Sequence, residues 1–67
     1  MFTFDGKEIK TVGDLLEGAK AAYAAGKAHE FRDAFRAVSE NADVNLGYVF
    51  GKEDESTQNE LLKAFFG

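Results

Sequence analysis

Residues 45–51 of this chain read Asn45-Leu46-Gly47-Tyr48-Val49-Phe50-Gly51, and this stretch decides the fold class. In a strand, Val44 and every second residue after it would share one face. In a helix, Leu46, Val49 and Phe50 form a stripe at positions i, i+3 and i+4, although the two glycines lower the helix propensity. The stretch therefore fits two structures, and its neighbours must decide between them.

The neighbouring residues favour a short helix over residues 44–50. Asp43 offers an N-cap, and Ala42 continues the apolar stripe of the preceding segment. We expect the Leu-Val-Phe stripe to enter the core, Gly47 to leave room for a close neighbour, and Tyr48 to face the surface. A strand that pairs with an N-terminal hairpin is the alternative.

That hairpin is predicted over residues 2–9, because Asp-Gly at positions 5 and 6 is a strong signal for a two-residue type I′ turn. In this register Phe2 opposes Ile9, and both share one apolar face with Phe4. A lone hairpin is barely stable in water, so this face must pack against other elements.

Two long helices are predicted after the hairpin. The first covers residues 12–25 and starts with a capping box formed by Thr11 and Asp14, with Asp in place of the preferred Glu. The second covers residues 28–41, on an apolar stripe that extends to Val38 and Ala42.

A last helix is predicted over residues 57–66. Ser56 or Thr57 would cap it, and Thr57 with Glu60 has the spacing of a capping box. Together these elements predict an α+β fold in one small domain, residues 1–67, with an N-terminal β-hairpin packed on a compact bundle of three to four short helices.

Composition restricts where and how this protein works. The chain has 67 residues, no cysteine and a formal net charge of −4. Disulfides and thiolate metal sites are therefore excluded. A secretory signal is not visible near the N-terminus, and no apolar run reaches the roughly 20 residues of a membrane span. We expect a cytoplasmic protein without membrane contact, and self-association is one way for so small a core to gain stability.

Catalytic or metal-binding groups are few, and we expect no enzyme and no cofactor. His29 is the only imidazole, and an exposed histidine at a helix start explains it better than an acid–base pair with Glu30 or Asp33. The acidic run 53–55 lacks the alternating ligands of a calcium loop and precedes a helix, where negative charge is favourable.

Basic residues on the predicted helix 28–41 offer an alternative function, namely nucleic-acid binding. Lys27, Arg32 and Arg36 would supply the phosphate contacts. Acidic residues are interleaved with them, Arg36 is expected to pair with Asp33 or Glu40, and the net charge is negative. A solvated helix face is the better interpretation.

Aromatic residues give the preferred functional hypothesis. Phe65 and Phe66 point about 100° apart on a helix, so one narrow core stripe cannot hold both deeply. A wider apolar face with Leu61 and Leu62 could hold both in the core; alternatively, one of them forms an exposed contact surface with Tyr48. We therefore predict a protein-binding module with Tyr48, Phe50, Phe65 and Phe66 as partner-binding residues.

Three short motifs stand out together: Phe4-Asp5-Gly6-Lys7 before a Thr-capped helix, Asn45-Leu46-Gly47-Tyr48, and Phe65-Phe66-Gly67. Together they resemble the small orphan accessory proteins that tailed bacteriophages encode in their non-structural gene blocks. The resemblance covers less than half of the chain and carries over no functional residue. It implies a protein of the host cytoplasm that binds a host or phage protein.

Overall fold

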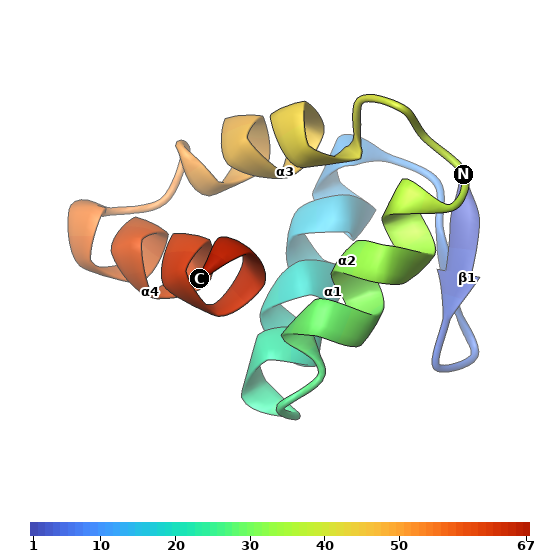
Figure 1. Cartoon of the computed structure of the whole chain (residues 1–67), viewed down its shortest axis with the longest axis horizontal. Helices are drawn as coiled ribbons and strands as arrows, with labels where there is room; N and C mark the ends of the chain where they lie inside the picture. The colour runs from blue at the N-terminus through green and yellow to red at the C-terminus, as the bar shows by residue number, and fades with distance from the viewer.

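The computed structural model describes residues Met1–Gly67 and contains a two-stranded antiparallel sheet and four helices. The hairpin lies beside the α1–α2 pair, and α4 lies on the other side of that pair, below α3 (Figure 1). The prediction of an α+β fold with an N-terminal hairpin on short helices is confirmed. The elements are β1 (Phe2–Phe4), β2 (Lys7–Ile9), α1 (Val12–Ala24), α2 (Ala28–Arg36), α3 (Ala42–Phe50) and α4 (Glu55–Phe66).

The hairpin has the predicted register, with Phe2 opposite Ile9 and Phe4 opposite Lys7. Its turn residues Asp5 and Gly6 have φ angles of 50° and 76°, the left-handed values that this turn requires. Ile9 is buried, and Phe2 and Phe4 are partly buried where they pack against the core. The hairpin thus places one apolar face on α1 and α2, as its sequence pattern indicates.

The start of α1 is the capping box predicted from Thr11 and Asp14. The Asp14 amide donates to Thr11 Oγ1 at 3.0 Å, and the Thr11 amide donates to Asp14 Oδ2 at 3.2 Å. Hydrogen bonds from the Lys10 and Thr11 amides lower the pKa of Asp14 below its usual value. At the other end, Gly26 adopts a φ of 73° and allows the chain to turn into α2.

The prediction for the end of the second helix is wrong. Helix α2 ends at Arg36 rather than at residue 41, and Val38 is exposed instead of continuing the core stripe. The amides of Val38 and Ser39 both bond to the Phe35 carbonyl, which closes the last turn. The chain then changes direction, and Ala42 is buried as the first residue of α3.

The stretch that decides the fold is a helix, but two details of its prediction are wrong. Helix α3 starts at Ala42, so Asp43 lies inside its first turn, and Asn41 occupies the cap without a side-chain bond. Asp43 instead pairs with Arg36, which was expected to bind Asp33 or Glu40. Gly47 has open space beside it rather than a close neighbour.

Helix α4 also begins earlier than predicted. Asp54 is its cap, because Asp54 Oδ1 accepts from the Thr57 amide at 2.8 Å; neither Ser56 nor Thr57 caps the helix. The side-chain and backbone hydrogen bonds with Thr57 lower the pKa of Asp54. The helix runs from Glu55 to Phe66 and places Phe65 in the core.

Phe31 lies at the centre of the core. Its ring centroid lies 5.2 Å from those of Phe2 and Phe4 and 6.1 Å from that of Phe65, in edge-to-face arrangements. This one side chain therefore joins the hairpin, α2 and α4. Helices long and apolar enough to cross a bilayer are absent.

Candidate functional site

Helix α3 has two apolar faces, of which only one is covered by the rest of the protein. The stripe Leu46, Val49 and Phe50 is buried, with exposed fractions of at most 1%. On the other side, Val44 and Tyr48 are 71% and 62% exposed. Residues four apart lie next to each other on a helix, so these two side chains form one strip, named here the α3 outer face.

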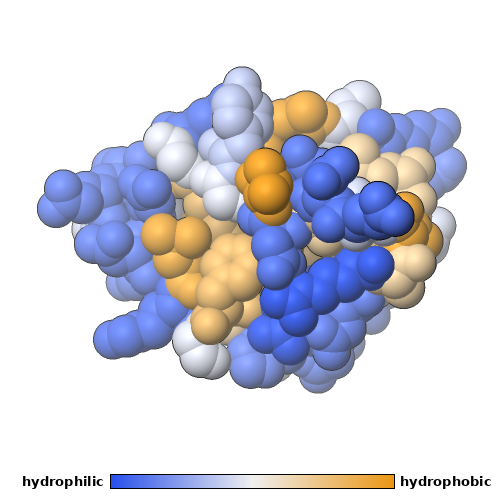
Figure 2. All heavy atoms as spheres, turned by 45° about the horizontal axis from the view of Figure 1, so that its top comes forward, coloured by the Kyte–Doolittle hydropathy of each residue, from blue (hydrophilic) through white to orange (hydrophobic).

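The surroundings of the α3 outer face are polar. Lys52 Nζ lies 4.8 Å from the centre of the Tyr48 ring, which is within the range of a cation–π contact. Figure 2 turns the α3 side of the molecule toward the viewer and shows hydrophobic atoms in several groups separated by hydrophilic ones. On this face, hydrophilic residues therefore border the exposed hydrophobic groups.

Two of the four predicted contact residues are not accessible. Phe50 and Phe65 are both 0% exposed, and their ring centroids are 5.0 Å apart inside the core. Their assignment to a contact surface is wrong, because the α3 stripe and the inner side of α4 face each other there. Phe66 is 38% exposed at the end of α4 and forms no aromatic pair with Tyr48.

Val44 is the functional candidate that sequence reasoning missed. It is the most exposed of the large hydrophobic residues. Once residues 44–50 are assigned to a helix, the spacing of Val44 and Tyr48 places both opposite the buried stripe. The signal was therefore present in the sequence and depended only on the choice between strand and helix.

The three basic residues of the nucleic-acid alternative are each bound by a carboxylate of the same chain. Lys27 Nζ lies 2.9 Å from Asp5 Oδ2, and the pKa of Lys27 is raised by that contact. Phosphate would have to compete with this bond.

Arg32 has an intramolecular role. Its Nη2 lies 3.0 Å from Asp33 Oδ1, and its Nη1 donates to the Phe65 carbonyl at 2.8 Å. The side chain is only 17% exposed. It therefore ties α2 to the last turn of α4, where unpaired carbonyls need donors.

Arg36 is also bound within the chain, by two parallel hydrogen bonds. Its Nε and Nη2 donate to the two carboxylate oxygens of Asp43 at 2.8 and 2.9 Å. The contact raises the pKa of the arginine and lowers that of Asp43. The pair joins the end of α2 to the start of α3 and therefore has a structural role.

Two acidic residues before α4 have partners within the chain, and the single histidine lies on the surface. Glu53 Oε1 lies 2.9 Å from Lys20 Nζ, and Asp54 caps α4. His29 is exposed and borders a shallow hollow with Tyr23 and Ala64. A group of three or more His, Asp or Glu side chains suited to a metal ion does not occur.

Comparison of the chain with family models, with curated proteins and with solved structures gives no match.

Proposed function

We propose that this chain is a non-enzymatic protein-binding module that uses the α3 outer face. The observation that carries the proposal is the exposure of Val44 and Tyr48 on one side of a helix whose other side is fully buried. Single exposed apolar residues are common on protein surfaces, whereas contiguous exposed apolar patches mark interaction sites.

The chemistry of the two side chains suits recognition by a protein. Tyrosine is enriched at interfaces, because its ring supplies contact area and its hydroxyl a hydrogen bond. Helical segments bind grooves through anchors at positions i and i+4, and Val44 and Tyr48 have this spacing. The buried stripe fixes the helix in place, so binding would cost little conformational entropy.

The partner is proposed to be another protein of the same cytoplasm, or a second copy of the chain. The resemblance to bacteriophage accessory proteins favours a host or phage protein. Phe66 is a further exposed aromatic residue, on α4 rather than on α3.

Substitution of Tyr48 tests the proposal. Tyr48→Ala is expected to weaken binding at least about tenfold, as for a central interface aromatic. Binding is measured by sedimentation equilibrium for self-association and by affinity capture from producing cells for other proteins. Tyr23→Ala is the matched control, since Tyr23 is also exposed but lies on α1.

The proposal fails if the wild-type protein is a monomer and Tyr48→Ala retains every captured protein. Circular dichroism of both variants confirms that each substitution leaves the helices intact.

A further inference from the structure

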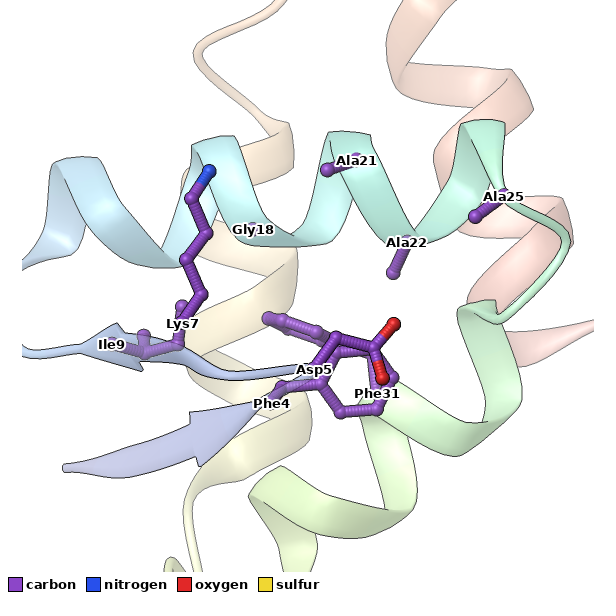
Figure 3. Close-up of a pocket in the computed structure, with 9 residues that line it drawn as sticks. All are labelled: Phe4, Asp5, Lys7, Ile9, Gly18, Ala21, Ala22, Ala25 and Phe31. Carbon is purple, nitrogen blue, oxygen red and sulfur yellow. The ribbon is translucent and has the colours of Figure 1, made fainter.

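A second surface feature lies between the hairpin and α1. It is a groove of about 230 Å³ whose lining is mostly apolar. Figure 3 shows Phe4 and Phe31 on one side of it and the small residues Gly18, Ala21 and Ala25 of α1 on the other. Its residues belong to elements other than α3.

The groove stays open because the α1 residues that line it are small. A Cβ at Gly18 would lie 2.8 Å from Ile9 Cδ1, so hairpin and helix are in close contact at that point. Farther along α1, Ala21 and Ala25 are exposed and leave the half-buried Phe4 ring uncovered by longer side chains, while the fully buried Phe31 forms the floor of the groove.

Size limits what the groove can hold. Pockets for whole ligands and cofactors usually measure about 300–1,000 Å³. The volume of about 230 Å³ is below this range and is sufficient for one or two amino-acid side chains. A segment of a partner protein with one apolar anchor therefore fits better than a free cofactor.

Charged residues at the rim of the groove indicate which residues of the partner segment lie next to its apolar anchor. Asp5 is neutralised by Lys27, 2.9 Å away. Lys7 borders the groove and takes part in none of the five ion pairs of the chain. Its side chain extends from β2 toward α1 (Figure 3). The rim is thus locally positive on a chain of net charge −4.

We propose that the groove binds a leucine-sized side chain of a partner protein segment, with an adjacent acidic residue paired to Lys7. The apolar walls supply the affinity, and Lys7 favours a partner segment with an acidic residue over one with a basic residue. This contact is independent of the α3 outer face, since the two surfaces share no residue.

Titration of the ¹⁵N-labelled protein with two short peptides tests the proposal. The probes are acetyl-Glu-Leu-Glu-amide and acetyl-Lys-Leu-Lys-amide. The acidic peptide should cause saturable shifts of the Gly18, Ala21 and Ala25 amides. The basic peptide should bind about three- to fivefold more weakly, as expected of one exposed ion pair.

Two variants separate the charge from the groove. Lys7→Glu should reverse the preference between the peptides. Ala21→Leu fills the groove and should weaken both peptides at least about tenfold, the value of one buried aliphatic side chain. Lys63→Glu and Ala24→Leu make the same changes at other exposed positions and should leave binding unaltered.

The proposal is overturned if neither peptide gives saturable shifts, if both bind equally, or if Lys7→Glu keeps the original preference. Octanoate serves as a third probe. Tighter binding of octanoate than of the acidic peptide would also overturn the proposal and would assign the groove to lipid. The response to Tyr48→Ala is measured separately, so the two proposed surfaces can fail independently.

Discussion

Gly18 shows how one missing side chain lets two elements meet. A Cβ at this position would lie 2.8 Å from Ile9 Cδ1 and 3.0 Å from Cε2 of the Phe31 ring. Both neighbours are buried, and Phe31 is held among other aromatic rings. Neither can withdraw without disturbing the hairpin or α2.

We expect Gly18→Ala to lower the free energy of unfolding by about 1–2 kcal/mol, because overpacking outweighs the helix propensity of alanine. Gly47→Ala is the matched control, since it also lies inside a helix but has no atom within 4 Å of a new Cβ. That variant should gain up to about 1 kcal/mol. Urea denaturation measures both, and equal effects would contradict the packing described for Gly18.

Phe65 and Phe66 show the limit of predicting the burial of single residues from the sequence. The 100° between Phe65 and Phe66 predicts that their environments differ. Which of them is buried depends on how α4 is rotated against Phe31 and Phe50, and that rotation is set by contacts between distant segments. The sequence pattern therefore could not choose between them.

At the scale of elements, the sequence predicts a turn or a helix start correctly where all the residues of the motif lie close together in the chain. The Asp-Gly turn and the Thr11–Asp14 capping box are such motifs, and both are confirmed. The end of α2 is different. Its apolar stripe continues to Val38, yet the helix stops at Arg36 because the chain turns to bury Ala42. Such a turn is a property of the packed molecule.

The cap of α4 gives a prediction about pH. Hydrogen bonding with Thr57 lowers the pKa of Asp54 from its usual 3.8. The resulting stabilisation is present above that value and is lost as pH falls through the lower pKa of the folded state. Asp54→Asn keeps a good cap but removes the ionisable group.

Urea midpoints at pH 7 and at about pH 2.5 test this link. Asp54→Asn should resemble the wild type at pH 7 and should lose less stability on acidification. Asp54→Ala should already be less stable at pH 7, because the Thr57 amide loses its acceptor. Glu60→Gln removes a negative charge but leaves the cap intact. If it reduces the loss of stability between pH 7 and about pH 2.5 as much as Asp54→Asn does, the Asp54 cap is not the cause of that loss.

The whole molecule carries a net charge of −4, and Lys27, Arg32 and Arg36 are each paired with a carboxylate of the same chain. Fluorescence anisotropy with a duplex DNA in 20 mM salt should therefore show binding weaker than about 10⁻⁴ M, the weak end of non-specific protein–DNA affinity. Low salt favours phosphate contacts, so tighter binding that is lost in Arg36→Gln would establish the nucleic-acid alternative.

The central claim is that the α3 outer face contacts a protein. A photo-crosslinking residue, p-benzoylphenylalanine, placed at position 48 in producing cells tests it most directly, with the same residue at position 23 as control. We predict discrete adducts from position 48 whose mass identifies a second copy or another protein, and none from position 23. Absence of adducts at position 48, or the same adducts from both positions, would contradict the claim.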